Sequence, residues 1–452
     1  MNQGLTIVPP PVVGEALRRL EARGFQAWCV GGCVRDSLLG KAPSDWDIAT
    51  SALPQETKAC FAGERLVEAG AAHGTIAWVP SGDHPIEITT FRSDGAYTDG
   101  RHPDSVAFSR RLEDDLSRRD FTVNAMAWHP QRGLVDLFHG QEDLSAGLLR
   151  CVGEPARRFS EDALRILRCL RFSSQLGFAI HPDTAQALWE KRELLLALSH
   201  ERVREELTKL LCGQGAAAVL RQYGAVVFTV LPELAPMKGC AQETPYHCFD
   251  VWEHTLHAVD YAPQQGDLRW AALLHDAGKP GRKTRSADGV AHFYGHPPES
   301  GRIARQLLTR LRFSNKERDW IAALVDHHED AMPMGEAHLK GLLGRYGERF
   351  VFTLFQLQEA DMSAKAPGVF ARRLPDLEES RALARAILER GDCLTLGDMA
   401  LTGEDLKALG VAPGPEMGKL LRRLLEAVQR GEAANTPAAL GELAKRLLKR
   451  GL

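Results

Sequence analysis

The chain has 452 residues, of which 44% are hydrophobic and 25% charged, and its formal net charge is −3. These proportions are ordinary for a globular protein, and the length exceeds what one hydrophobic core supports, so we expect three or four domains. A net charge near zero excludes a globally basic protein. Any nucleic-acid partner must therefore bind a local patch.

The nine cysteines are scattered and form no C-x-x-C pair. This usage favours reduced thiols over a disulfide framework or a cysteine-ligated zinc site. The N-terminus has no signal-peptide pattern, and no apolar run reaches the length of about 18 residues that a membrane span needs. We therefore expect a cytoplasmic protein with no membrane partner.

Hydrophobic periodicity predicts a mixed first third and a helical remainder. The first third should hold a helix over 14–23, a strand over 27–30, a hairpin of strands 75–79 and 86–91 around Ser81-Gly82-Asp83, and a polar, glycine-rich loop over 92–103. Helical patterns then cover 155–235, break at Thr244-Pro245-Tyr246, resume over 250–330 and continue past Pro333 to basic C-terminal turns.

Two nearby segments, VGGCVRD and SDWDIAT, concentrate residues suited to metal-assisted chemistry. In the first, Gly31 and Gly32 can bring backbone N–H groups close to a polyphosphate. In the second, Asp45 and Asp47 alternate at the period of a strand, so they should share one face and offer a site to a hard cation such as Mg²⁺. Either pair alone is more often a turn or a polar strand edge, but together they predict chemistry on a nucleoside triphosphate.

This combination resembles the signature of CCA-adding enzymes and bacterial poly(A) polymerases, class II of the polymerase-beta-like nucleotidyltransferases. The signature reads Gly-Gly-x-x-Arg-Asp, a short spacer, then Asp-x-Asp. The resemblance extends over roughly residues 25–235. It implies Mg²⁺ at Asp45 and Asp47, with Gly32 and Arg35 holding the triphosphate. Glu87, in the strand predicted at 86–91, could join the metal site or simply face solvent on the hairpin.

The segment LSRRDFTVNA, from Leu116, matches a second family motif, Arg-Arg-Asp-Phe-Thr-x-Asn-Ala. An exposed Arg-Arg pair is usually just a solvated face. The resemblance instead implies that Arg119 contacts the nucleotide and that Asp120 and Asn124 serve its ribose.

The next run, SEDALRILRCLRF, predicts a helix with Ser160 as its N-cap. Asp162 and Arg165 would be neighbours on it, either as an intrahelical ion pair or, as the family's Glu-Asp-x-x-Arg motif implies, as a protein template for the base. A carboxylate accepts and a guanidinium donates, which suits cytosine and adenine and leaves unpaired groups against uracil and guanine. The resemblance further implies that Arg168 and Arg171 hold phosphates.

A second ligand set lies in the later helical region, in the order His, His-Asp, His, His-His, Asp. Imidazoles and carboxylates suit a hydrolytic divalent metal, and the order resembles the HD phosphohydrolase superfamily. This implies a transition metal such as Mn, Ni, Co or Fe, or a retained fold that only grips RNA. The core pattern would be His254, His275, Asp276 and Asp361, with His296 and either His327 or His328 at a second metal.

The resemblances imply an enzyme that adds CCA to the tRNA 3′ end from CTP and ATP and releases pyrophosphate, with an added phosphohydrolase activity. The implied fold is α+β: a head with a small mixed sheet, then an all-α neck, HD body and tail. A poly(A) polymerase, an HD phosphohydrolase with an RNA-binding head, and a nonenzymatic RNA-binding module are the alternatives, and the sequence is compatible with an oligomer. The implied domains are the head (1–150), the neck with the base-selecting helix (151–240), the HD domain (241–365) and a tRNA-binding tail (366–452).

Overall fold

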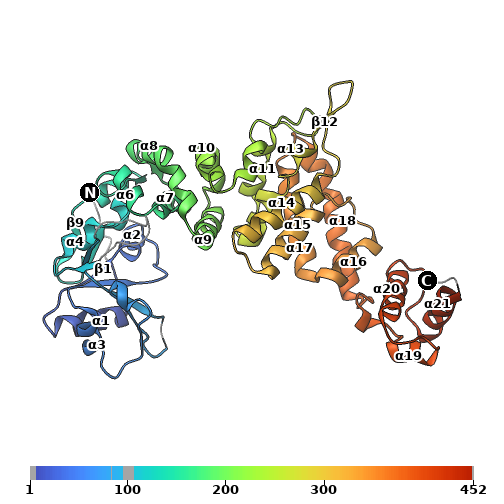
Figure 1. Ribbon diagram of the computed structural model, residues 1–452, viewed down its shortest axis with the longest axis horizontal. Helices are drawn as coiled ribbons and strands as arrows, with labels where there is room; N and C mark the ends of the chain where they lie inside the picture. Colours follow the sequence, from blue (N-terminus) through green and yellow to red (C-terminus); the bar gives the residue numbers. More distant parts are fainter. Residues whose placement is uncertain (1–6, 83, 95–105, 450–452) are drawn as a thin grey trace. The chain divides into compact units, whose positions relative to one another are not determined.

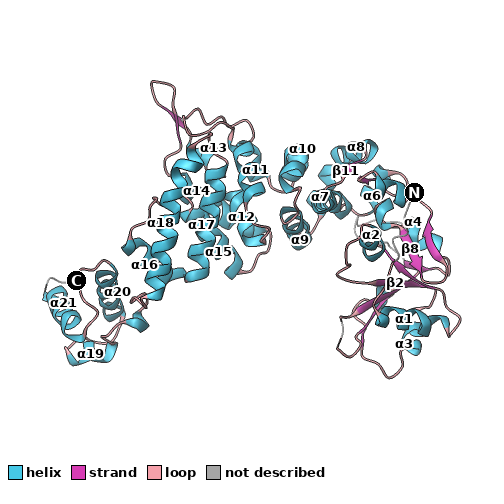
Figure 2. Ribbon diagram, turned by 180° about the vertical axis from the view of Figure 1, so that it is seen from behind, coloured by secondary structure: helices cyan, strands magenta, loops and turns pink. Residues whose placement is uncertain are grey.

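The computed structural model describes residues 7–82, 84–94 and 106–449, and the chain divides into two compact units, 1–230 and 231–452 (Figure 1). The first unit contains a β-sheet, whereas the second is built almost entirely of helices (Figure 2). The predicted class, a nucleotidyltransferase-like head with a mixed sheet followed by helices, is confirmed. Of the loop predicted over 92–103, residues 95–103 lie outside the described residues, and the loop prediction is wrong for Arg92–Asp94, which form a strand.

A mixed sheet of seven strands in the described chain forms the centre of the first unit. β2 and β5 run parallel, and the other neighbours pair antiparallel. The strand predicted at 27–30 and the predicted hairpin are both confirmed, as β1 and as β4 with β5. In spatial order the strands are β3 (Leu66–Val67), β4 (Thr75–Trp78), β5 (Ile86–Thr90), β2 (Asp47–Thr50), β1 (Ala27–Val30), β8 (Met126–His129) and β9 (Gly133–Asp136).

Helices pack against this sheet because their apolar faces match its buried faces. α1 (Pro11–Glu21) confirms the first predicted helix and packs beside α3 (Pro54–Cys60) (Figure 1). Leu112 and Leu116 of α4 (Leu112–Ser117) join Trp28, Val30 and Ala49 in one buried cluster. Smaller elements of this part are α2 (Gly32–Leu38), α5 (Gly140–Ser145), β6 (Arg92–Asp94) paired with β7 (Val106–Phe108), and β10 (Leu148–Leu149) paired with β11 (Ala179–Ile180).

The rest of the first unit is helical, as predicted for 155–235. α7 packs along α9, so the two helices form one layer of the unit. Its helices are α6 (Pro155–Glu161), α7 (Leu164–Leu176), α8 (Pro182–Lys191), α9 (His200–Leu211) and α10 (Ala216–Phe228).

The single helix predicted with Ser160 as its N-cap is wrong. The chain forms two helices here, and α6 begins earlier, where the Glu154 carboxylate accepts the N–H groups of two residues of its first turn. Asp162 then interrupts the helical path with an extended backbone (φ −140°, ψ 105°). Its carboxylate accepts the N–H of Leu164 at 3.0 Å, which satisfies one of the free donors at the start of α7. This break leaves the Asp162 side chain outside both helices.

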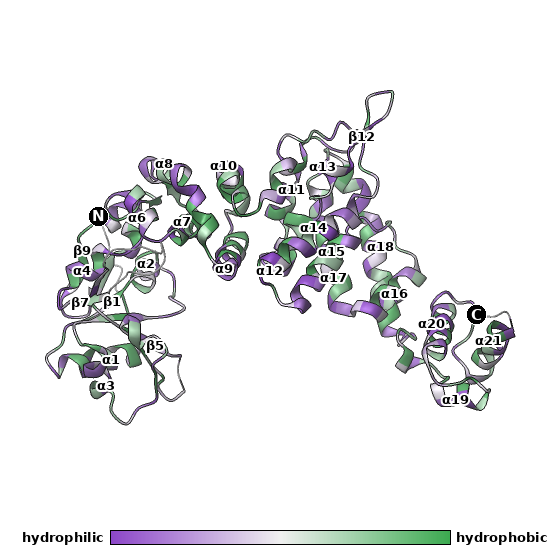
Figure 3. Ribbon diagram, viewed as in Figure 1, coloured by the Kyte–Doolittle hydropathy of each residue, from purple (hydrophilic) through white to green (hydrophobic). Residues whose placement is uncertain are grey.

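The second unit is an assembly of amphipathic helices, which alternate hydrophobic and hydrophilic surface (Figure 3). A short hairpin of β12 (Thr284–Arg285) and β13 (Ala291–His292) interrupts the predicted helical block. In the described chain, no helix is both long and apolar enough to cross a membrane. The helices are α11 (Val251–Tyr261), α12 (Gly266–Leu274), α13 (Lys279–Arg282), α14 (His296–Arg310), α15 (Asn315–His327), α16 (Glu336–Tyr346), α17 (Glu348–Ser363), α18 (Val369–Glu389), α19 (Gly403–Ala408), α20 (Pro415–Gln429) and α21 (Pro437–Lys449).

Candidate active site

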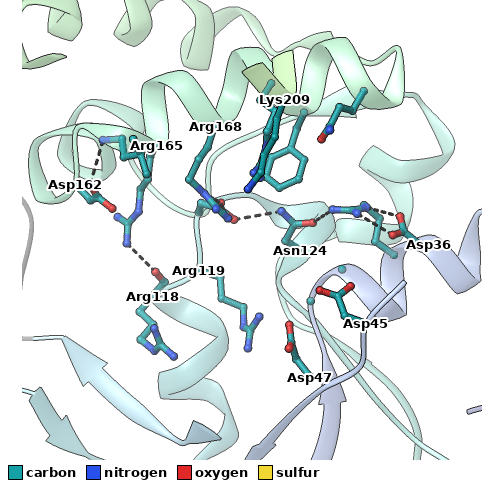
Figure 4. Close-up of a pocket in the computed structure, with 18 of the residues that line it drawn as sticks. Asp36, Asp45, Asp47, Arg118, Arg119, Asn124, Asp162, Arg165, Arg168 and Lys209 are labelled. Atoms are coloured by element: carbon teal, nitrogen blue, oxygen red, sulfur yellow. Dashed lines mark hydrogen bonds and ion pairs between the residues drawn. The ribbon is translucent and has the colours of Figure 1, made fainter. Parts of the chain in front are cut away.

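The residues that the sequence assigned to nucleotide chemistry converge on one cavity of about 880 Å³ in the first unit (Figure 4). Helix α2, the approach to β2, the segment after α4, and helices α7 and α9 each contribute side chains to it. The predicted residues in its lining are Gly32, Arg35, Asp45, Asp47, Arg119, Asp120, Asn124, Asp162, Arg165, Arg168 and Arg171.

Carboxylates gather where β2 begins. Asp47 is the first residue of β2, but Asp45 lies before the strand, so the prediction that both share one strand is wrong. The parallel pairing of β2 with β5 sets Glu87 directly beside Asp47. Burial, and the negative charges of Glu87 and Asp45, raise the pKa of Asp47 to about 6. Three carboxylates that repel one another in this way fit a hard divalent cation, which would relieve the repulsion.

The first glycine of the pair packs closely against an arginine. Gly31 has φ +77°, and a Cβ atom there would lie 2.9 Å from Nη1 of Arg119. The same guanidinium donates from Nη2 to the buried Asp115 at 3.0 Å, beside Arg118 at 2.7 Å. Burial alone would raise the pKa of Asp115, but the charges of Arg119 and Arg118 outweigh it and lower that pKa. Arg119 is therefore held in place against the glycine turn.

A chain of hydrogen bonds crosses the floor of the cavity (Figure 4). Arg35 donates from Nη1 to Asn124 at 2.6 Å, and Asn124 donates to Asp120 at 3.3 Å. Asp120 also accepts from Nη2 of Arg168 at 2.6 Å. Burial raises the pKa of Asp120, but the Arg168 charge overrides this and brings it down to about 2. The network fixes four predicted nucleotide-contacting side chains relative to one another.

Cationic side chains from α2 and α7 surround one aromatic ring. The guanidinium carbons of Arg35, Arg168 and Arg171 lie 5.2, 5.3 and 4.1 Å from the ring centroid of Phe172. Cation–π attraction lets these like charges gather at one site. Arg171 also pairs at 3.2 Å with Glu206, which is buried like it, and desolvation lowers the pKa of Arg171.

The two residues predicted to read the base sit at the break between α6 and α7. Arg165 donates to the Glu161 carboxylate at 2.8 Å and to the carbonyl oxygens of Arg158 and Arg118, each at 3.1 Å. Asp162 instead accepts from Arg202 of α9, at 3.2 Å from Oδ2. The alternative of an ion pair between Asp162 and Arg165 within one helix is therefore wrong, because Asp162 is not helical and each residue has another partner.

Comparison with known proteins places this site in a family. Three family descriptions match: "Poly A polymerase head domain" over 27–150, "Probable RNA and SrmB-binding site of polymerase A" over 177–237, and "tRNA nucleotidyltransferase domain 2" over 299–444. A CCA-adding enzyme of Lactobacillus delbrueckii subsp. bulgaricus is 35% identical, with 94% of this chain and 95% of that protein covered. The chain belongs to the CCA-adding enzyme family.

Further relatives of the CCA-adding family agree along the whole chain. The enzyme of Levilactobacillus brevis is 36% identical, with 94% of each chain covered. A crystal structure of the Bacillus stearothermophilus CCA-adding enzyme in complex with CTP is 31% identical, with a TM-score of 0.75, 98% of this chain and 99% of that chain covered. Nucleotidyltransferases of this family use a divalent metal, generally Mg²⁺, and the carboxylates around Asp47 fit such an ion.

The second unit of this CCA-adding family member contains a buried cluster of histidines around one aspartate. The Asp276 carboxylate lies between two pairs of imidazoles. Its Oδ2 is 3.4 Å from Nε2 of His254 and 3.2 Å from Nε2 of His275, and its Oδ1 is 3.1 Å from His296 and 3.6 Å from His328. Asp276 with His254 and His275, and Asp276 with His296 and His328, each have the spacing of a metal site.

The hydrogen-bonding geometry of these four rings fits a cation between them. Each Nδ1 lies within hydrogen-bonding distance of a backbone carbonyl, at 3.1, 2.8, 3.0 and 2.7 Å for His254, His275, His296 and His328. A ring that donates from Nδ1 presents a bare lone pair at Nε2. The Nε2 atoms nevertheless face each other in pairs at 3.3 Å. Imidazole nitrogens that face each other at this distance fit a shared metal ion.

The structure decides between the two adjacent histidines at the end of α15. His328 joins the cluster, whereas Nδ1 of His327 lies 2.8 Å from Asp330. Of the two alternatives, the structure therefore brings His328, and not His327, to Asp276. Asp361 does join, with Oδ1 3.0 Å from Nε2 of His254.

Several residues around the two sites were missed from the sequence. Lys279 and Lys365 each lie 2.7 Å from a cluster carboxylate, on Asp276 and Asp361 respectively. Lys279 stands three residues after His275-Asp276, a spacing that could have suggested it. In the first unit, Arg202 and Lys209 of α9 line the cavity, and no local pattern in the sequence indicated this.

Proposed function

We propose that this chain adds C, C and A to the 3′ end of tRNA from CTP and ATP, without a nucleic-acid template. The 3′ oxygen of the RNA attacks the α-phosphorus of the incoming nucleotide, the bond to the bridging oxygen breaks, and pyrophosphate leaves. Full-length similarity to CCA-adding enzymes supports the reaction. The carboxylates at the start of β2, opposite the cationic wall of α7, support its site.

Asp45 and Asp47, with Glu87 beside Asp47, would hold the Mg²⁺. When bound there, the metal stabilises charge on the attacking and leaving oxygens. The protein's own cations, Arg35 and Arg119 among them, attract and orient the triphosphate, and the buried Asp120 keeps Arg168 in place.

Base choice would rest on Asp162 and Arg165. Arg165 is held by one carboxylate and two carbonyl groups, so its orientation is fixed before the nucleotide arrives. Asp162 offers acceptor atoms to the exocyclic amino group of cytosine or adenine. Uracil and guanine present an acceptor at that place, so two acceptors would face each other with no proton between them, and the site disfavours these bases.

The experiment is single-nucleotide addition to tRNA that lacks its 3′ CCA, with each nucleotide offered separately and then together. Wild-type protein should add C, C and A in order and incorporate U and G poorly. Asp162→Ala should lower the preference for C over U by roughly tenfold to a hundredfold, the effect of one lost hydrogen bond to a charged group. Asp45→Ala should remove all addition. Equal slowing of every nucleotide by Asp162→Ala would refute the template role, and long poly(A) tails made from ATP alone would favour the poly(A) polymerase alternative.

The domain division follows from the same proposal. We propose a head over 1–150, a neck over 151–240, a histidine-rich body over 241–365 and a tRNA-binding tail over 366–452, in a cytoplasmic protein. The basic turns of the tail, which include Lys419 and Arg446, are suited to RNA phosphates.

We also propose a second activity, a metal-dependent phosphohydrolase, at the cluster around Asp276. The observation that favours it is the set of four imidazoles whose Nε2 atoms converge on one carboxylate. A transition metal bound there would supply a hydroxide at neutral pH. Lys279 and Lys365 would keep the two cluster carboxylates oriented.

The test is hydrolysis of cyclic and terminal nucleotide phosphates with Mn²⁺, Ni²⁺ or Co²⁺. His328→Ala should remove the activity and spare CCA addition, while the matched control His327→Ala, one residue earlier, should retain both. No hydrolysis by wild-type protein with any of these metals would leave the body with a structural role in RNA binding.

A further inference from the structure

Arg202 on α9 is the partner of the residue proposed to read the base. Its Nη2 lies 3.4 Å from Oδ1 and 3.2 Å from Oδ2 of Asp162, and both side chains line the nucleotide cavity. We infer that Arg202 is a specificity-determining residue, which sets the preference for cytosine and adenine by holding the carboxylate of Asp162 toward the base. The inference rests on the proposed nucleotide addition and deepens it.

A side-chain partner matters at Asp162 because this residue links two helices and is not part of a regular turn of either. It lies at the break between α6 and α7, with extended φ and ψ angles. One oxygen, Oδ1, is also engaged by the N–H of Leu164 at 3.0 Å. A carboxylate has about four acceptor positions, so these two partners leave room for the amino group of a base. Without the guanidinium, the N–H of Leu164 alone would hold the carboxylate, through one oxygen.

The geometry of Arg202 also suits a site that must accept a ligand. Its contacts to Asp162 are longer than the roughly 2.7–2.9 Å of a tight charge-assisted hydrogen bond, so the pair can adjust when a third group enters. Its other amino group, Nη1, is buried without a hydrogen-bond partner among the described residues. A buried donor without a partner is costly. An acceptor atom of the bound nucleotide would satisfy it.

Other arginines of the cavity wall are committed to different partners. Arg165 is held by Glu161, Arg168 by Asp120, and Arg171 by Glu206. Lys209 lies seven residues after Arg202 on the same helix and also lines the cavity. Because the described structure gives it no hydrogen bond to Asp162, it provides the matched control.

The experiment measures addition of each of the four nucleotides to tRNA that lacks CCA, as kcat and KM, for wild type, Arg202→Gln and Lys209→Gln. Arg202→Gln should slow C and A addition about tenfold while U and G change little, so the preference for C over U falls about tenfold. Arg202→Lys, which keeps the charge but not the fork, should restore part of that preference. Lys209→Gln should slow all four nucleotides alike, because it removes only positive charge. Equal slowing of all four by Arg202→Gln, or an unchanged preference, would overturn the inference.

A double variant separates this inference from the function it rests on. If Arg202 acts through Asp162, the double variant with Asp162→Ala should show the same loss of preference as Asp162→Ala alone. Additive losses would overturn the inference. Wild-type protein that adds neither C nor A would instead refute the proposed function, so the two failures are distinguishable. Melting temperatures of the variants identify any that fail to fold. If Arg202→Gln is one of them, the preference for C over U is compared between wild type and Arg202→Lys instead.

Discussion

Asp47→Asn should make the metal-free protein more stable while it removes nucleotide addition. The pKa of Asp47 is raised from 3.8 to about 6 by burial and by the charges of Glu87 and Asp45. The native carboxyl therefore keeps its proton to a higher pH than the unfolded one, and stability falls as pH rises from about 4 to about 6. At about 1.4 kcal/mol for each pKa unit, the ionised carboxylate costs up to about 3 kcal/mol above that range.

The assay is thermal unfolding in a chelator, at pH 8 and at pH 4.5, for wild type and Asp47→Asn. At pH 8 the variant should gain between about 1 and 3 kcal/mol, which for a unit of this size is an increase of several degrees in Tm. At pH 4.5 the gain should fall to about a third, because the native carboxyl then keeps its proton. The remaining cost is the ionisation that the unfolded chain gains and the native state forgoes. Mg²⁺ should stabilise wild type more than the variant.

A control variant tests the physical cause. Asp45→Asn changes an exposed carboxylate of the same cluster, so it should lose addition with a much smaller gain in stability. If Asp47→Asn melts at or below the wild-type temperature at pH 8 without metal, the repulsion argued for these carboxylates is refuted.

Two further variants test the packing of the cavity. Gly31→Ala should reduce nucleotide addition at least tenfold, because the new Cβ meets Arg119 at 2.9 Å on a left-handed backbone. The control Gly24→Ala, also at positive φ but in open space, should lose only about 1 kcal/mol of stability. Equal activity of the two variants in the addition assay would contradict this. Arg168→Met should cost roughly 2–3 kcal/mol of unfolding free energy at pH 7, because it leaves the buried Asp120 without its counter-charge. That difference should shrink as pH falls below about 4, toward the native Asp120 pKa of about 2, and chemical denaturation that shows a constant difference from pH 7 to pH 3 would argue against the ion pair.

Local signals in the sequence were sufficient for β1, β4 and β5 and for the helical regions, but not for β3, β8 and β9 of the same sheet. The apolar run at 27–30 became β1, because a short hydrophobic segment beside a glycine turn has few other places in a fold. The sequence around Asp162 led to a wrong prediction of one continuous helix. Its residues favour a helix, and the interruption between α6 and α7 depends on tertiary structure. Arg202, which lies 40 residues further along the chain, could not be read from local pattern.

The site was predictable where ligands cluster in sequence and unpredictable where they depend on orientation. His327 and His328 are adjacent, so composition cannot distinguish them, but successive residues of a helix point about 100° apart and only one can reach Asp276. Glu87 was left open for a similar reason. Its hairpin partner β4 is a local neighbour, whereas its pairing with β2 is a long-range choice that sets it beside Asp47.

The parallel pairing of β2 with β5 also has a consequence for biosynthesis. Asp47 and Glu87 are 40 residues apart in sequence. Glu87 reaches its place beside Asp47 only after the strand at 86–90 has docked against β2. Until then β2 is an edge strand, paired on the β1 side alone. A nascent chain that ends before Ile86 therefore presents an incomplete ion site on an unprotected strand edge, which is prone to misassociation. Tight metal binding should begin only when about the first 90 residues have left the ribosome. The bound metal would then stabilise the correctly folded head.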